Sequence, residues 1–181
     1  MPSSNNQVNY IFGGFHGAYP LFKYFSIGFQ RYSNSDRIIA FRRNLHLTDS
    51  SQSKTWHDVR TSGAVSVSDD TWHHVAIVVK PFQRSWSTSL YLDGSPTTLQ
   101  AVTAPSAANT DSYYDSALDF LVSRYSTIYE QFDVNEIGVW SSELTSSEIA
   151  EIYNQGSDGF DLSKDKGDYA SSSDLYSWYK M

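Results

Sequence analysis

The chain contains no cysteine among its 181 residues. It therefore has no disulfide framework, no thiolate nucleophile and no cysteine-ligated metal. Charged residues are also scarce, at 18%, and acidic side chains outnumber basic ones to give a net charge of −7. Because nucleic acids and anionic membranes are bound by clustered Lys and Arg, neither is an expected partner.

Long apolar runs are missing as well. No segment approaches the length of a membrane span, so no membrane insertion is expected. The first six residues are polar and lack the apolar stretch of a signal peptide. The chain is therefore expected either to be intracellular when made, as a virion protein is, or to have a targeting segment outside this sequence. The one basic cluster, Arg37 to Arg43, is interpreted as a strand edge or a solvated face.

Aromatic residues, in contrast, are abundant. They make up 15% of the chain, with 13 Tyr, 10 Phe and 5 Trp, and hydrophobic residues reach 40%. Aromatic side chains favour strands, interfaces and sugar-stacking surfaces. Together with many Ser, Thr, Asn and Gln residues, this composition is typical of a β-rich domain on an extracellular or virion surface, and the length suits one domain with a hydrophobic core.

Short apolar segments separated by turn residues predict an all-β sandwich or barrel. The segment 72–79 is apolar on both alternating faces, which predicts a strand buried on both sides and ended by Pro81. Asp93-Gly94 predicts a tight turn between two strands. The expected strands cover residues 8–15, 21–29, 37–43, 72–79, 89–92, 97–102, 118–123 and 133–140, with loops at 48–54 and 103–116.

One helix is predicted between the last of these strands and the tail. Thr145 is its N-cap, and Glu148 three residues later completes a capping box. Leu144 and Ile149 are placed to form a hydrophobic staple, and Gly156 ends the helix. The side chains expected to share one face of this helix are Ile149, Ile152 and Tyr153.

The tail, residues 157–181, is acidic and ends in the aromatic segment Leu-Tyr-Ser-Trp-Tyr at 175–179. Exposed aromatic patches are unfavourable in water. We therefore expect the tail to pack on the sandwich body, residues 1–156, or on a neighbouring subunit.

Three segments, in this order, resemble the laminin G-like branch of the concanavalin A-like lectin and glucanase superfamily. Residues 70–76 (Asp-Thr-Trp-His-His-Val-Ala) are similar to its Trp-His-His-Val-Ala strand, and residues 90–94 (Leu-Tyr-Leu-Asp-Gly) to its hairpin. Residues 135–140, 144–149 and 153–154 are similar to its last strand and short closing helix. The resemblance implies an antiparallel two-sheet jelly-roll sandwich, a fold that carries many unrelated activities.

The beginning of the sandwich departs from the family pattern. Family members open with strands before a Phe-Ser-Ile type segment, and residues 25–27 are either that segment or part of the strands that follow it. In the second case the leading strands are lacking and an open sheet edge is left for strand addition by another chain. Residues 169–181 also resemble linkers in phage structural proteins with laminin G-like domains. Self-association, or assembly with other virion subunits, is therefore expected.

The acidic residues do not predict catalysis. A retaining glycosidase needs two carboxylates on one face, about 5–5.5 Å apart. Glu130, Asp133 and Glu136 are each three residues apart, so neighbours on one strand point to opposite faces. The Glu-x-Asp-x-Glu signature of the superfamily's glucanases is absent. No catalytic residue is assigned, and the protein is not expected to be an enzyme.

No metal ligand is assigned either. His73 and His74 are adjacent, so on a strand their side chains face opposite ways and cannot chelate one ion; both are interpreted as structural. Calcium is the one cofactor that the resemblance allows, since many relatives bind it at a loop edge. The pentraxin Glu-Gln-Asp loop is missing, because Phe132 follows Glu130 and Gln131. The acidic loop residues, none at the spacing of an EF-hand, are Asp111, Asp115, Asp158, Asp161, Asp165 and Asp168.

A glycan site would combine exposed aromatic faces with polar side chains. The alternative is that the same aromatic rings complete the core or pack against a partner subunit. The candidate ligand-binding residues, in or near expected loops, are Trp56, Trp86, Tyr113, Tyr114 and Tyr125.

Three functional hypotheses follow. The first is a non-catalytic structural or adhesion module on a virion surface, as a decoration, fibre or tail protein that binds a partner subunit or a host glycan. The second is a glycan-binding lectin domain of a larger secreted protein. The third, disfavoured by the carboxylate spacing, is a glycoside hydrolase.

Overall fold

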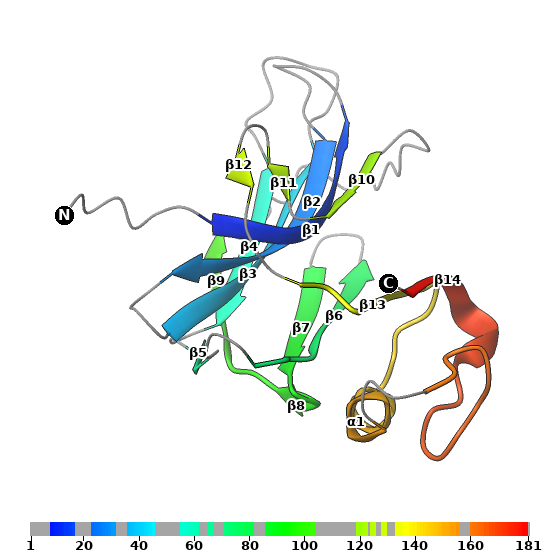
Figure 1. Ribbon diagram of the computed structural model, residues 1–181. Helices are drawn as coiled ribbons and strands as arrows, with labels where there is room; N and C mark the ends of the chain where they lie inside the picture. Colours follow the sequence, from blue (N-terminus) through cyan, green and yellow to red (C-terminus); the bar gives the residue numbers. More distant parts are fainter. Residues whose placement is uncertain are drawn as a thin grey trace. The chain divides into compact units, whose positions relative to one another are not determined.

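The computed structural model describes residues 8–16, 23–31, 36–45, 55–61, 65–66, 71–81, 86–103, 119–122, 124–125, 128–129, 133–155 and 160–180 (Figure 1). Side-chain surroundings are described at residue 27 and in 71–79, 88–99, 133–155 and 160–180. The chain divides into two compact units that alternate along the sequence. The first is Met1–Thr71, Pro81–Ser87 and Thr98–Gln131, and the second is Trp72–Lys80, Thr88–Thr97 and Phe132–Met181.

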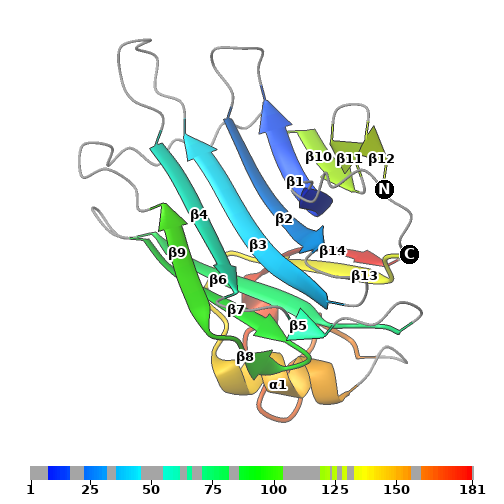
Figure 2. The ribbon, with the colours of Figure 1, turned by 90° about the vertical axis from the view of Figure 1, so that its left-hand side faces the viewer.

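A seven-stranded antiparallel sheet dominates the first unit, and Figure 2 shows its long strands side by side. The order is β10-β1-β2-β3-β4-β9, with β5 paired to β3. The strands are β1 (Val8–His16), β2 (Lys23–Arg31), β3 (Asp36–Leu45), β4 (Thr55–Thr61), β5 (Val65–Ser66), β9 (Leu99–Thr103) and β10 (Asp119–Val122). A separate hairpin joins β11 (Arg124–Tyr125) to β12 (Ile128–Tyr129).

The register of this sheet corrects one prediction. The basic segment 37–43 lies in β3, which pairs with β2 on one side and with β4 on the other, so it is not at a strand edge. The pairing places Arg42 directly opposite Asp58 of β4.

Two strand predictions differ from the structure. The segment 97–102 was expected to return after the turn as one strand, but residues 97 and 98 lie outside any strand and residues 99–102 belong to β9. Ser95–Pro96 (β8) pairs with β7 (Trp86–Leu92), whereas β9 pairs with β4. The strand β4 itself was not predicted, because its polar sequence, Thr-Trp-His-Asp-Val-Arg-Thr, lacks the apolar alternation of a half-buried strand.

The second unit contains most of a three-stranded sheet, β6-β7-β8, in which β6 spans Val75–Pro81. The predicted strand 72–79 therefore begins three residues late, although it ends at Pro81 as expected. Residues 75–79 are only partly buried, so the expectation of burial on both faces is wrong. Just before β6 begins, the backbone of residue 74 is hydrogen-bonded to Asp93 in the turn that follows β7.

The helix α1 (Ser146–Asn154) begins as predicted. The Thr145 hydroxyl accepts a hydrogen bond from the backbone N–H of Glu148, and the Glu148 carboxylate accepts one from the backbone N–H of Thr145. Both halves of the capping box are therefore present. Gly156, the expected stop, lies outside the described residues, and the helix is capped by Gln155.

The tail supplies the core of the second unit. The strand β14 (Leu175–Lys180) follows the 3₁₀ turn Ser172–Asp174 and pairs antiparallel with β13 (Glu136–Trp140). Figure 1 shows α1 and the tail, coloured gold to red, gathered together. The boundary at residue 156 stays a prediction. The core cluster is Phe160, Leu162 and Tyr169, and the side chains packed against it are Trp140, Leu144, Ile152, Leu175 and Trp178.

The described elements are antiparallel sheets and one α-helix, which confirms the predicted all-β fold. Within the described part of the chain, no helix has both the length and the apolar character that crossing a bilayer requires.

Candidate functional site

The hairpin turn between β7 and β8 is the geometric centre of the candidate site. Asp93 and Gly94 both have positive φ, at 50° and 72°, as a type I′ turn requires. A Cβ atom on Gly94 would lie 2.8 Å from Cδ1 of Tyr153, so glycine is needed for close packing as well as for backbone conformation. The turn and helix α1 are thereby held in direct contact.

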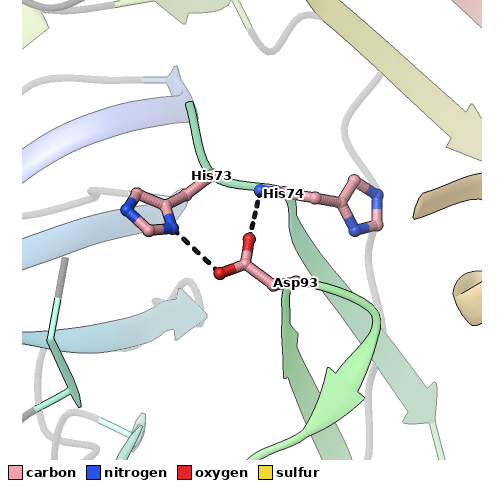
Figure 3. A network of polar contacts seen from close by, with 3 residues as sticks. All are labelled: His73, His74 and Asp93. Atoms are coloured by element: carbon pink, nitrogen blue, oxygen red, sulfur yellow. Dashed lines mark hydrogen bonds and ion pairs between the residues drawn. The ribbon is translucent and has the colours of Figure 1, made fainter. Parts of the chain in front are cut away.

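One carboxylate ties this turn to the segment that precedes β6 (Figure 3). Oδ2 of Asp93 lies 2.9 Å from Nδ1 of His73, and Oδ1 accepts a hydrogen bond of 3.0 Å from the backbone N–H of His74. The backbone N–H of Asp93 in turn donates to the His74 carbonyl at 2.8 Å. Three contacts between residues about twenty positions apart thus join the Trp-His-His-Val segment to the Asp-Gly turn.

The rings of His73 and His74 point in opposite directions, as Figure 3 shows. This is the arrangement that the sequence predicted for adjacent residues. His73 is hydrogen-bonded at Nδ1, but its Nε2 atom, like Nδ1 of His74, is buried without a partner. The His74 ring packs against the Tyr153 ring at 6.0 Å between centroids. Divergent rings cannot supply two ligands to one metal ion.

Burial lowers the pKa of His74 below its ordinary value of 6.5, and the negative charge of Asp93 offsets only part of that effect. The folded state therefore favours the neutral imidazole. The unfolded chain binds a proton more readily than the folded protein does, so stability must fall when the pH drops below 6.5.

We expect His74→Gln to remove this part of the pH dependence. Urea unfolding between pH 7.5 and 5 should show a decline in the free energy of unfolding for the wild-type protein that is smaller in the variant. The charged neighbour of His74, Asp93, and the ring packed against it, Tyr153, are both retained in the variant. An identical decline in both proteins would assign it to other titrating groups.

The structure does not bring the predicted ligand-binding aromatics together in one sheet. Trp56 is in β4 of the seven-stranded sheet, Trp86 is the first residue of β7, and Tyr125 is in the β11–β12 hairpin. Tyr113 and Tyr114 lie outside the described residues. Their assignment as glycan contacts stays a prediction.

Other aromatic side chains, which were not predicted as ligand-binding residues, are exposed in the second unit. The exposed fractions are 81% for Tyr176, 66% for Trp72, 46% for Tyr179 and 41% for Tyr153. The sequence predicted Trp72 to be the first residue of a buried strand, and it is exposed because β6 begins only at Val75. The one available signal was its position after the polar residues 69–71.

The acidic residues weighed for catalysis are not assembled in the described part of the chain. Asp133 is exposed and precedes β13, whereas Glu136 is the first residue of β13 and faces Lys180 of β14 across the sheet. Glu130 lies outside the described residues. The described carboxylate with the deepest burial is Glu148, at 6% exposure, and it accepts hydrogen bonds on both of its oxygens.

The acidic loop of the tail does not fit calcium where it is described. The Asp161 carboxylate binds Ser163 and Lys164, which together hold its pKa at about 2. Oδ1 of Asp165 accepts a hydrogen bond from the backbone N–H of Ser172. Asp168 is exposed, and no group of three or more His, Asp or Glu side chains able to hold a metal occurs among the described residues. The loop residues that lie outside them are Asp111, Asp115 and Asp158.

Comparison with known proteins places these features in a family. A laminin G family model, described as the concanavalin A-like lectin/glucanases superfamily, matches residues 2–150. No curated protein and no solved structure matches the chain significantly. The matched region contains both segments joined by Asp93 and the capping box of α1. The chain therefore belongs to the laminin G-like family of the concanavalin A-like lectin/glucanase superfamily, and its antiparallel all-β fold is of that type.

Proposed function

We propose that the protein is a non-catalytic module that binds carbohydrate or mediates adhesion. The observation that carries the proposal is the exposure of the Trp72 side chain, at 66%, on a fold whose superfamily includes lectins. Aromatic faces stack on the apolar faces of sugar rings, while neighbouring polar groups hold the hydroxyls. Laminin G-like domains are typically non-catalytic, which agrees with this assignment.

The buried carboxylate of Glu148 is not suited to act as a general acid. A glycosidase requires a carboxylic acid whose pKa is raised so that it can donate a proton. Burial would raise the pKa of Glu148, but hydrogen bonds from Ser171, Thr145 and Ala170 outweigh it and hold that pKa below its ordinary value. Glu148 therefore serves the structure of α1 and is unsuited to acid catalysis.

An array of immobilised oligosaccharides, probed with and without calcium, tests the proposal. We expect binding to at least one sugar class without release of free sugar. Hydrolysis of a bound glycan that disappears in Glu136→Gln would instead establish an enzyme. Complete lack of binding in both conditions would contradict a lectin function.

We further propose display on a virion or another extracellular surface, with other subunits or a host glycan as partners. The support is compositional, namely 18% charged and 15% aromatic residues, together with the resemblance of residues 169–181 to linkers in phage structural proteins. Light scattering on the same preparation gives the molecular mass in solution. A stable oligomer would support assembly, whereas a monomer would favour a lectin domain that acts alone in a larger secreted protein.

A further inference from the structure

We propose that Trp72 is the surface on which a sugar ring stacks, and that the Asp93 carboxylate accepts hydrogen bonds from the same sugar. This inference rests on the proposed function, because it names the site at which the carbohydrate is bound. The sequence predicted Trp72 to lie in a buried strand and Asp93 in a turn.

The exposure of Trp72 is the first support. Its side chain is 66% exposed, whereas Trp140 and Trp178, the other tryptophans with described surroundings, are partly buried against the core of the second unit. Tryptophan offers a large, flat apolar face that a sugar ring can cover. Because the Asp93 carboxylate is tied to the two residues that follow Trp72, a ligand with both polar and apolar groups suits this position better than an apolar protein surface does.

The backbone that carries Trp72 is held in place, which is the second support. The next residue, His73, contacts the Asp93 carboxylate through its ring, and the N–H and carbonyl of His74 are both hydrogen-bonded to Asp93 (Figure 3). The turn is itself fixed by Gly94 against Tyr153. A ring on a pre-organised backbone loses little conformational entropy when a ligand binds.

Asp93 provides the polar partner. Its side chain is 31% exposed, so the carboxylate remains accessible to a ligand. Each of its oxygens has one recorded partner, His73 for Oδ2 and the His74 N–H for Oδ1, and a carboxylate oxygen can accept a second hydrogen bond. Oδ1 of Asp93 lies 3.0 Å from the backbone nitrogen of His74, which is two residues along the chain from Trp72.

Tyr176 offers a matched control. It is even more exposed than Trp72, at 81%, but it lies at the irregularity in the β13–β14 pairing, where Val139 faces Ser177 and Trp140 faces Leu175. Its immediate neighbours, Leu175 and Ser177, carry no carboxylate, so a sugar at Tyr176 would lack the polar partner that Asp93 provides. Both side chains are exposed, so truncation of either is expected to leave the fold intact.

The test measures sugar binding by the wild-type chain, Trp72→Ala, Trp72→Phe and Tyr176→Ala. The probes are oligosaccharides ending in β-galactose, β-glucose or N-acetylglucosamine, followed by titration with the tightest binder. We expect Trp72→Ala to weaken binding by roughly 30-fold, the effect of losing a central aromatic contact. Trp72→Phe should be intermediate because it keeps an aromatic face, and Tyr176→Ala should match the wild type.

The outcomes separate the two proposals. Binding by the wild type that survives Trp72→Ala overturns the present inference and leaves the proposed function in place. Absence of binding by the wild type overturns both. If Trp72→Ala lowers the melting temperature, acrylamide quenching of the wild-type protein gives an independent answer, since a bound sugar must shield the exposed Trp72 ring and unchanged quenching contradicts the site.

Discussion

Replacing Tyr169 with alanine is expected to lower the free energy of unfolding by about 3–5 kcal/mol, the usual cost of removing a fully buried aromatic side chain. Tyr169 is 0% exposed and lies at the centre of the core cluster of the second unit. Its ring meets Phe160 and Trp140 edge-on, at centroid distances of 5.5 Å and 6.4 Å. Truncation would leave a cavity lined by Phe160 and Leu162 of this cluster and by Trp140, which packs against it.

The Tyr169 hydroxyl contributes separately from the ring. It donates to the Leu162 carbonyl and accepts from Nε1 of Trp140, each at 2.9 Å. Burial raises the pKa of Tyr169, so the hydroxyl stays protonated and able to donate across the neutral pH range. Tyr169→Phe keeps the ring but leaves both partners unsatisfied, and we expect it to cost about 1–3 kcal/mol.

Urea unfolding followed by tryptophan fluorescence measures both variants. The matched control is Tyr176→Phe, which removes a hydroxyl from a side chain that is 81% exposed and should change stability by less than about 0.5 kcal/mol. Stability of Tyr169→Phe equal to that of the wild type would show that water replaces the hydroxyl at no cost.

Replacing Glu148 with alanine is expected to cost about 2–4 kcal/mol, because it removes a helix cap and leaves buried donors unsatisfied. One carboxylate oxygen accepts the backbone N–H and the hydroxyl of Thr145, at 2.8 Å and 2.9 Å. The other accepts the backbone N–H of Ala170, at 3.2 Å, and the hydroxyl of Ser171. Glu148 thus fixes the start of α1 to the tail that supplies the core.

The same residue should make stability depend on acid pH. Its pKa lies below the ordinary value of 4.5, because the hydrogen bonds from Ser171, Thr145 and Ala170 together exceed the effect of burial. A carboxyl with a depressed pKa contributes stability above the unfolded value, and that contribution is lost as the pH falls through the folded value. We therefore expect the loss to occur below about pH 4.5.

The variant Glu148→Gln keeps the shape of the side chain but removes its negative charge, so it tests the contribution of the charge to stability. It should be less stable than the wild type at pH 7, since an amide nitrogen cannot accept the two hydrogen bonds that reach its position. The difference should shrink as the pH drops below 4.5, when the wild-type carboxyl becomes protonated. Asp168→Asn, at an exposed acidic position of the same tail, should leave the unfolding curve unchanged across that range. A constant difference between wild type and Glu148→Gln would show that the charge has no part in the stabilisation.

Features that depend on neighbouring residues were predictable from the sequence. The capping box of Thr145 and Glu148 and the turn at Asp93-Gly94 each involve residues within a few positions, and both are present. Their conformations follow from hydrogen bonds and backbone sterics inside one short segment. The ordered set of short motifs also identified the family and its all-β fold.

Features that depend on distant residues required the tertiary structure. Glu148 was predictable as a cap, but its bonds to Ala170 and Ser171 come from 22 and 23 residues away. The β4 strand has no apolar alternation, and it exists because β3 and β9 supply its backbone partners. Likewise, the central position of Tyr169 depends on Trp140 and Phe160, which reach it from other parts of the chain.

The candidate site shows the same division. The residues Trp72 to His74 and Asp93-Gly94 were recognised as two motifs, and the sequence alone determined that each would form an extended segment and a turn. Only the tertiary structure showed that the Asp93 carboxylate joins them and that the strand starts at Val75, leaving Trp72 in solvent. The reason is that backbone conformation is set by adjacent residues, whereas the exposure of a side chain is decided by whatever the rest of the chain places over it.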